Sequence, residues 1–448
     1  MPKVTLLDYT KDPFKLAVAS ARTCYSSKLV LPEDVSEGQL ERIGVSIFEA
    51  GHHTPYQHPT FVFGIEDVSR QCVWSFLHSH PFYNSDQQSQ RYVSMDEVKV
   101  FVPEFSDSGN REIYMNAVGE AWKAYFELSE ILKKDNFVLM ERIGKIKGQD
   151  EKQIRTDSEK KAIEMARYVV PVAATCNLHH TVSAVTLFRY KRMMNACDCP
   201  AEAREVVDQM IAEVAKIDPE FIEKIGEATL EENELIENSS FERCEFASDF
   251  DRDLDGKISK LVSFDRGAEK LVADQVREVL GVSVDDDEAI DLLVNPAKNK
   301  YLMSTLNAYS HSPLMRILNN VYYVFKKKIS HTADSQDQRH RMTPACRPML
   351  SKVHTEKPDF ETPFIIGRNE RALEIYERTM KILWDAKNKL IAGGVSASDA
   401  CYLLPNAVNV RFTQSGSLLN FLHKWRLRTC FNAQLEIYDA SIDEIKQV

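Results

Sequence analysis

A dense polar segment at residues 78–92 holds the side chains best suited to chemistry. It reads His-Ser-His-Pro-Phe-Tyr-Asn-Ser-Asp-Gln-Gln-Ser-Gln-Arg-Tyr and contains almost no aliphatic side chain. Its hydroxyl, amide and guanidinium groups offer many hydrogen bonds, and Arg91 can clamp a phosphate or a carboxylate through two parallel bonds. His78 and His80 add imidazoles, a side-chain type that exchanges protons near neutral pH. Composition alone equally allows a solvated polar loop, so both interpretations stay open.

Two further basic segments lie in the second half of the chain. One begins with Lys326-Lys327-Lys328 and ends with Ser-Gln-Asp-Gln-Arg-His-Arg at residues 335–341. Within an acidic protein this charge favours a phosphate-bearing ligand over a solvated helix end. The other segment, residues 411–428, contains an apolar helix face formed by Leu418, Leu419, Leu422 and Trp425. Its Arg426 and Arg428 either reach a neighbouring pocket or lie on the surface as basic C-terminal residues of that helix.

Composition and charge limit the class of protein. The chain has 448 residues, of which 44% are hydrophobic and 27% charged, as in a soluble globular protein with two domains. A net charge of −11 argues against a broad nucleic-acid surface. The sequence has no apolar run of about 18 residues, so we expect no membrane span. It also lacks the Gly-rich dinucleotide fingerprint, the P-loop and the Gly-x-Ser-x-Gly elbow, so any cofactor must use another architecture.

Nine scattered cysteines indicate reduced thiols and a cytoplasmic protein rather than a disulfide framework. Cys197 and Cys199 resemble half of a metal site. They lack a second Cys or His pair at zinc spacing, so the sequence predicts no metal centre there.

The hydrophobic pattern predicts the elements that position these segments. Strands are expected at residues 4–9 and 58–66, where Phe61, Phe63 and Ile65 alternate with other side chains. Apolar positions at helical spacing predict helices over residues 12–24, 68–77, 111–133, 180–195 and 201–217.

The second half of the chain repeats the order of features in the first. The matching pairs are residues 4–8 with 262–265, 53–55 with 311–313, 88–92 with 336–340, 170–171 with 404–405, and 203–206 with 434–437. This order predicts a tandem duplication of one α+β unit. We expect a first repeat at residues 1–230, an acidic linker at 231–257 and a second repeat at 258–448. Residues 251–258 also match the start of a calcium loop, but Val262 stands where such a loop needs Glu.

These motifs resemble those of flavin-dependent thymidylate synthases. The first half carries the resemblance at residues 4–9, 21–27, 51–58, 68–70, 87–93 and 166–171, and the second half at 402–405, 420–422 and 433–437. The implied fold class is α+β, with two tandem copies of a thymidylate synthase-like unit whose helices pack on a small sheet. The family's Arg-His-Arg triplet reads His78-Ser79-His80 in the first half and Lys326-Lys327-Lys328 in the second. The chain therefore resembles a divergent member.

The resemblance also implies roles for particular residues. It gives catalytic roles to Ser89, Arg91 and Arg167. It implies that the nucleotide is held by Gln88, Ser89, Gln90, Arg91, Arg167, Arg339 and Arg428. It implies that the flavin is lined by His53, Thr54, His78, His80, Gln87, Lys326, Lys328 and Asn420.

The reaction implied by the family transfers the methylene of methylenetetrahydrofolate to C5 of dUMP, using FAD reduced by NADPH, and yields dTMP. The family's tetramer, with sites at subunit junctions, implies a homodimer of this duplicated chain with composite sites. No nucleic-acid or membrane partner is expected. Two alternatives stay open: a non-catalytic nucleotide-binding or assembly homologue, and a flavin enzyme that acts on another pyrimidine.

Overall fold

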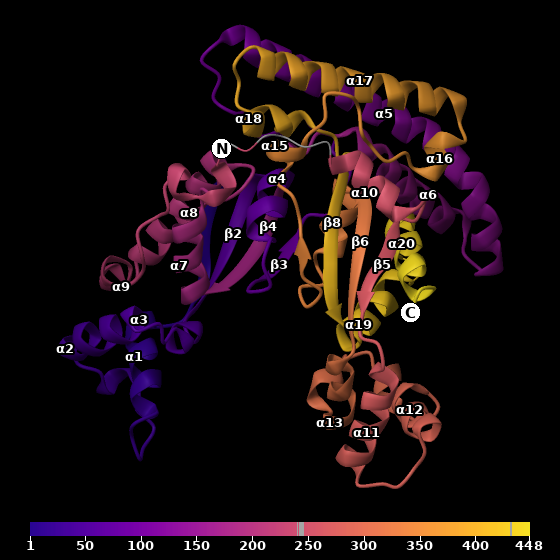
Figure 1. The fold of residues 1–448 in the computed structure, drawn as a ribbon. Helices are drawn as coiled ribbons and strands as arrows, with labels where there is room; N and C mark the ends of the chain where they lie inside the picture. The colour runs from indigo at the N-terminus through magenta and orange to yellow at the C-terminus, as the bar shows by residue number, and fades with distance from the viewer. Residues whose placement is uncertain (240, 242–245, 431) are drawn as a thin grey trace. The chain divides into compact units, whose positions relative to one another are not determined.

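The computed structural model describes residues 1–239, 241, 246–430 and 432–448 (Figure 1). The chain forms two compact units, Met1–Glu242 with Met349–Ala407 and Arg243–Pro348 with Val408–Val448. The units differ from the repeats expected at 1–230 and 258–448, because residues 349–407 pack in the first unit. The repeat boundaries concern sequence similarity rather than packing, and they stay a prediction.

Each unit contains one antiparallel sheet, and the two sheets have the same topology. The first has the order β1-β2-β4-β3, formed by Lys3–Tyr9, Thr60–Ser69, Thr175–Ser183 and Asn84–Gln87. The second has the order β5-β6-β8-β7, formed by Ser259–Phe264, Tyr322–Ser330, Asn409–Ser417 and Ala345–Cys346. The pairings β1–β2 and β5–β6 both contain a register shift. The shared topology confirms an α+β fold with two copies of one unit.

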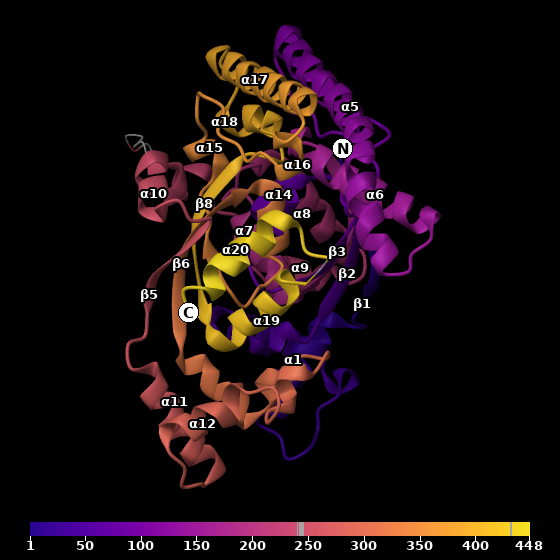
Figure 2. The ribbon, with the colours of Figure 1, turned by 90° about the vertical axis from the view of Figure 1, so that its right-hand side faces the viewer.

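Helices form much of the core of the first unit, and two of them, α7 (Ala184–Met193) and α8 (Pro200–Ala215), pack on its sheet. The others include α1 (Pro13–Thr23), α5 (Ser108–Ile146) and α6 (Glu151–Ala166). Helix α17 (Glu370–Ala392), from the second half of the chain, lies alongside α5 (Figures 1 and 2). Both helices bury apolar side chains at helical spacing, including Tyr114, Val118, Tyr125, Tyr376 and Leu383. Burial of this apolar surface joins residues 349–407 to the first unit.

The second unit combines its sheet with shorter helices. They are α10 (Phe246–Leu254), α11 (Ala268–Leu280), α12 (Asp286–Val294), α14 (His331–Asp337), α19 (Leu418–Arg428) and α20 (Leu435–Ile445). One core cluster contains Val276, Leu293 and Met315. A second cluster packs Phe421 between Phe325 and Trp425, with ring centroids 5.2 and 5.3 Å away. Of the expected helix face, Leu419 and Trp425 are buried and Leu418 and Leu422 are partly buried, whereas residues 411–417 form β8.

Most predicted elements are confirmed, with three corrections. The helix expected over residues 68–77 begins only at Arg70, because Val68 and Ser69 pair within β2. Residues 180–183 belong to β4 rather than to a helix, and α7 begins only at Ala184. Residues 246–254 of the expected acidic linker form α10, which packs in the second unit. Cross-strand pairing and ion pairs determine the secondary structure of these segments, and neither produces a hydrophobic periodicity in the sequence. Among the described residues, no helix is long and apolar enough to span a bilayer.

One hydrogen-bond motif occurs in both units and sets the register between the repeats. In the first, Glu202 accepts bonds from the Ser69 backbone N–H at 2.7 Å and the Ser69 hydroxyl at 2.5 Å. In the second, Glu436 accepts the same pair of bonds from Ser330, at 2.5 and 2.7 Å. The sequence comparison had aligned Glu205 with Glu436. The structure corrects this match by three residues, so that Glu202 corresponds to Glu436.

Candidate functional site

Three arginines of the first unit are brought together by the ends of its elements. Arg70 follows the last residue of β2, and its backbone N–H donates to the Ala174 carbonyl at 2.9 Å. Arg91 lies just beyond β3, and Arg167 begins the short helix η5 (Arg167–Val169) after α6. Segments separated in the sequence thus place their guanidinium groups near one another.

Glu164 of α6 organises this arginine cluster. Its carboxylate, which is 2% exposed, forms ion pairs with Arg91 and, at 3.1 Å, with Lys161. The Arg167 Nε–H donates to the Glu164 backbone carbonyl at 3.3 Å. The Glu164 carboxylate is therefore paired with Arg91 and a half-buried lysine, and the charges of Arg91 and Arg70 both act on Arg167.

The burial of Arg70 and Arg167 indicates that this cluster favours a bound anion. Arg70 is 6% exposed, and its Nε and Nη1 atoms have no hydrogen-bond partner in the described part of the chain. Burial lowers the pKa of Arg167 to about 10, with Arg91 and Arg70 acting in the same direction and Glu164 opposing them. A phosphate or carboxylate would supply the acceptors that these two Arg70 nitrogens lack.

The glutamine-rich segment lies beside the same cluster. The half-buried Ser89 accepts a bond from the Arg91 backbone N–H at 3.2 Å. The Asn406 amide donates to Gln90 at 3.1 Å and to the Arg167 carbonyl at 3.0 Å. The structure therefore brings together four of the predicted residues, Ser89, Gln90, Arg91 and Arg167.

A cavity of about 300 Å³ adjoins this cluster. Its lining includes Gln88, Trp122 and Cys176, and the Cys176 thiol is hydrogen-bonded to Arg70. The buried Trp122 Nε1 has no partner among the described residues, so a donor is available at this cavity. Gln87 lies next to it in β3, opposite Leu178 of β4, with its side-chain oxygen buried and unpaired in the described structure.

His78 and His80 lie in a different environment from the one expected. The His78 ring stacks on Tyr83 with centroids 4.6 Å apart. His80 and His180 each bond to the Tyr190 hydroxyl, at 2.7 and 2.9 Å. Burial lowers the pKa of His180 to about 3, so this ring stays neutral. The two predicted flavin residues thus belong to a packed cluster of imidazoles and phenols.

His53 and Thr54 lie at the far end of β2 from the arginine cluster. His53 packs on Phe48 and bonds to its carbonyl at 3.2 Å, and Thr54 begins η3 (Thr54–Gln57). The ten residues of β2 separate this end from Arg70 by about 30 Å. Within one unit, these two residues and the arginines cannot touch the same small ligand.

In the second unit, the predicted lysines form ion pairs with α10. Lys326 Nζ lies 2.5 Å from Asp253, and Lys328 Nζ lies 2.8 Å from Asp251. Asp251 also receives two bonds from Arg411, at 2.7 and 2.8 Å. The charges of Lys326 and Lys328, which the resemblance implies at the flavin, are therefore used in ion pairs within the protein. These acidic residues hold basic side chains, which also argues against the calcium-loop alternative.

A second polar cavity, of about 400 Å³, lies in the second unit. Its lining includes the predicted residues Arg339 and Asn420, together with Arg341, His340 and Asn307. Nε2 of His340 and Oδ1 of Asn307 are buried without a partner in the described residues. Arg428 does not line this cavity and donates to the Gln336 carbonyl at 2.7 Å. The second unit therefore joins Arg339 with Asn420 in a site rich in hydrogen-bonding groups.

Sequence reasoning missed Arg70, Glu164 and Asn406 as parts of the first site. Arg70 carried a usable signal, since it ends the Val68-Ser69-Arg70 motif directly after an alternating strand. Glu164 is one charged residue among many in α6, and nothing in the pattern marks it as buried. Asn406 lies in the second half of the chain. It reaches this site because residues 349–407 pack in the first unit.

Comparison with known proteins agrees with this geometry. The sequence matches the family model described as Thymidylate synthase complementing protein (Thy1) over residues 5–220 and 260–448. It is 32% identical over 235 residues to the flavin-dependent thymidylate synthase of Clostridium tetani, covering 52% of this chain and 89% of that protein. The enzyme of the same name from Nitratidesulfovibrio vulgaris is 32% identical over 238 residues, covering 50% and 87%.

A solved structure, the UMP/dUMP methylase PolB from Streptomyces cacaoi bound with 5-Br dUMP, is similar at 18% identity with a TM-score of 0.38. The similarity covers 50% of this chain and 94% of the PolB chain. The Thy1 match extends over both repeats and most of the sequence. The chain therefore belongs to the Thy1 family of flavin-dependent thymidylate synthases, as a tandem-duplicated member.

Proposed function

We propose that this chain converts dUMP to dTMP, with methylenetetrahydrofolate as the one-carbon donor and a flavin reduced by NADPH. The observation that carries this proposal is the cluster of Arg70, Arg91 and Arg167, in which Arg91 pairs with Glu164 and two buried Arg70 nitrogens have no partner among the described residues. Such a cluster is suited to a dianionic phosphate monoester, because bidentate arginine contacts satisfy several phosphate oxygens at once.

The neighbouring cavity is suited to the base of the same nucleotide. Cys176 both lines this cavity and bonds to Arg70, so a phosphate at the cluster leaves the attached nucleoside close to Gln88 and Trp122. The unpaired Trp122 Nε1–H can donate to a pyrimidine carbonyl. In this arrangement Arg70 and Arg91 hold the phosphate, Arg167 supports the charge, and Ser89 lies beside the bound nucleotide.

The flavin fits only part of the residue set expected for it. His78 and His80 are packed among aromatic rings, and Lys326 and Lys328 are paired with Asp253 and Asp251. Arg339 and Asn420 do line a polar cavity whose unpaired His340 Nε2 and Asn307 Oδ1 await hydrogen-bond partners. A bound flavin would supply the hydride of the reaction. Arg339, Arg341 and Asn420 would contribute binding of its phosphates.

Two measurements test this proposal on the intact chain. The visible absorbance spectrum, recorded before and after adding FAD, reports flavin binding directly. Release of tritium from dUMP labelled at C5 reports whether the C5–H bond is broken when NADPH and methylenetetrahydrofolate are present. We expect both a bound-flavin spectrum and tritium release. A protein that binds dUMP but neither binds FAD nor releases tritium contradicts the proposal.

A second candidate function is nucleotide binding without catalysis. It is favoured by the ion pairs that occupy Lys326 and Lys328, since these charges are not available to a flavin. Calorimetry with dUMP alone separates the two candidates. Binding of dUMP that is unaffected by FAD, NADPH and folate, with no product formed, is the behaviour expected of this alternative.

A further inference from the structure

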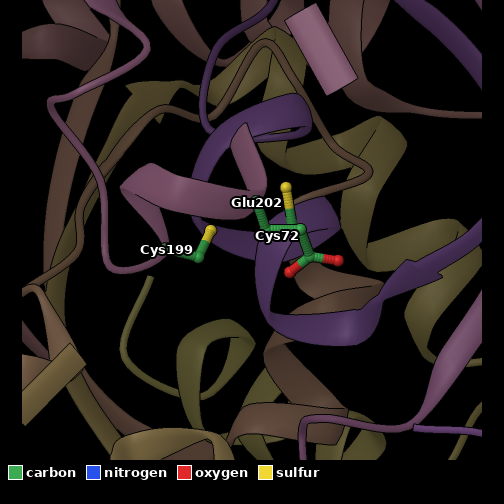
Figure 3. A group of neighbouring side chains, drawn as sticks. All are labelled: Cys72, Cys199 and Glu202. Atoms are coloured by element: carbon green, nitrogen blue, oxygen red, sulfur yellow. The ribbon is translucent and has the colours of Figure 1, made fainter. Parts of the chain in front are cut away.

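A cluster of buried thiols lies in the first unit, outside the groups assigned above. Cys72 of α4 (Arg70–Cys72), together with Cys199 and Glu202 at the start of α8, is 2% exposed or less. One ligand atom from each, two sulfurs and a carboxylate oxygen, lies within 4.8 Å of the others (Figure 3). Two elements from distant parts of the sequence thus converge on one point.

Cys197 lies beside this group of three, in contact with Cys199, and would have to turn its thiol further inward to become a fourth ligand. Its Sγ lies 3.8 Å from Cys199 Sγ. Two thiolates bound to one tetrahedral zinc ion, with Zn–S bonds of about 2.3 Å, have their sulfurs roughly 3.8 Å apart. The spacing of Cys197 and Cys199 therefore already matches that of two ligands on a single ion.

Glu202 has capacity for one more interaction. Its carboxylate accepts three hydrogen bonds, two from Ser69 and one from the Tyr402 hydroxyl at 2.6 Å. A carboxylate has about four lone-pair positions, so one remains for a metal ion. The bonds from Ser69 and Tyr402 would fix the orientation of the carboxylate, as outer-sphere partners do in metal sites. Ser75 Oγ, 3.2 Å from Cys199 Sγ, would support one thiolate in the same way.

The second unit shows that the fold does not need these thiols. There Ser330 and Glu436 form the same hydrogen bonds as Ser69 and Glu202. The Ala333 N–H bonds to Ser330 Oγ at 3.1 Å, as the Cys72 N–H bonds to Ser69 Oγ at 2.9 Å. Ala333 therefore stands in the place of Cys72, and by the same register Ala433 stands in the place of Cys199. The thiols are an addition confined to the first unit of a shared scaffold.

We infer that Cys72, Cys197, Cys199 and Glu202 form a binding site for one thiophilic divalent cation, with zinc as the ion their chemistry fits best. Three thiolates and a carboxylate are the donor types of closed, four-coordinate zinc sites. Binding releases the thiol protons to solvent and involves no change of oxidation state. The site ties the start of α8 to α4, the short helix that Arg70 begins, and so holds this part of the arginine cluster in place.

The test measures zinc per chain in the intact protein, expressed with added zinc and purified under reducing conditions. We expect about one zinc ion per chain, by elemental analysis. Cys72→Ala and Cys199→Ala, which copy the second unit, are expected to retain less than about a tenth of this amount. Cys401→Ala, a change at a buried cysteine of the same unit that is not one of the four ligands, is expected to keep full zinc.

Titration with cobalt gives a readout that does not depend on catalysis. Tetrahedral cobalt bound to thiolates shows intense d–d and charge-transfer absorption, which we expect in the wild-type chain and not in Cys199→Ala. A zinc-free protein with all thiols titratable, or one with a Cys197–Cys199 disulfide, overturns the inference. Equal zinc content in the wild type and in both cluster variants overturns it as well. These outcomes are independent of dUMP turnover, so they separate the metal site from the proposed function.

Discussion

At the scale of single residues, Arg70 and Arg91 illustrate two kinds of buried cation. Arg91 is paired with Glu164, so its charge is balanced in the protein alone. Arg70 is buried with two nitrogen atoms that have no partner in the described structure. A buried, incompletely bonded guanidinium is costly unless a ligand completes its hydrogen bonds. The two arginines should therefore respond differently to substitution.

Replacing Arg91 tests the assignment of the phosphate site. Arg91→Ala should weaken dUMP binding by about 1.5–3 kcal/mol, the range for loss of a hydrogen bond to a charged group. It also leaves Glu164 buried with only Lys161 as an ion-pair partner, so a loss of stability should accompany the loss of affinity. Calorimetric titration measures the affinity, with Arg155→Ala on the exposed face of α6 as the control. Unchanged dUMP affinity rules out this role for Arg91.

Replacing Arg70 should separate binding from stability. Arg70→Met keeps the buried volume but removes a guanidinium with two unpartnered nitrogens, so the ligand-free protein should be at least as stable as the wild type. Affinity for dUMP should fall by about 1.5–3 kcal/mol, since a charged contact to phosphate is lost. Thermal unfolding without and with dUMP reports both effects. A marked loss of stability without ligand, at unchanged affinity, would show that Arg70 has a purely structural role.

At the scale of elements, the second unit is held together by a buried ion network between β6, α14, α19 and α20. Lys424 lies 3.1 Å from Asp337 and 3.3 Å from Glu444, and Lys327 pairs with the same two carboxylates. All four side chains are at most 2% exposed. The Gln414 amide donates to Asp337 at 2.9 Å and accepts from Lys327 at 2.9 Å. Two positive and two negative charges thus balance in a closed network.

Breaking this network from one side should destabilise the second unit. Lys424→Met leaves two buried carboxylates with one lysine, a change that costs about 3–5 kcal/mol in comparable buried pairs. Hydrogen exchange read at α19 and α20 measures this loss locally, which matters because a chain of two units need not unfold in one step. Lys298→Met, at an exposed pair with Asp291, is the matched control. Equal exchange in both variants would contradict the role of the network.

The same network predicts acid sensitivity. Burial raises the pKa of Asp337 and of Glu444, but Lys327 and Lys424 outweigh it and hold both pKa values below their usual range. Carboxyls with depressed pKa values stabilise the fold above the pKa of the unfolded chain, and the effect is lost as the pH falls through the folded pKa. Protection of α19 and α20 from exchange, corrected for the intrinsic rate, should therefore decline below about pH 4. Asp337→Asn should flatten this decline.

The elements also show how far sequence reasoning reaches. Strong periodicity predicted α1, α5, α8 and β2, because a buried face imposes a repeat on the sequence. The strand at residues 180–183 and the helix α10 were not predicted, because strand pairing and ion pairs determine these two structures. Ser89, Gln90, Arg91 and Arg167 were predicted as one site from family motifs. Arg70 and Glu164 became visible only when packing showed which charges are buried.

At the scale of the whole molecule, the two ends of β2 pose a question of assembly. His53 and Thr54 lie at one end and the arginine cluster at the other, about 30 Å apart in the same unit. The family resemblance places all of these residues at one bound flavin and nucleotide. The separation of about 30 Å and the resemblance agree only if one site combines residues from different copies of the repeat. The expected assembly is a homodimer that presents four repeats.

Complementation between two inactive variants tests this composite site. His53→Ala and Arg91→Ala should each be inactive alone, because each removes one side of every site built on the first unit. If a site takes its two sides from different chains, mixed dimers regain one intact site. Random mixing then restores roughly a quarter of wild-type activity, since half of the dimers are mixed and each has one of two sites intact. Tritium release from C5-labelled dUMP, measured after the variants are unfolded and refolded together, gives the answer. Recovery shows that the two ends of β2 serve different sites across a subunit interface, whereas no recovery places both sides of the site in one chain.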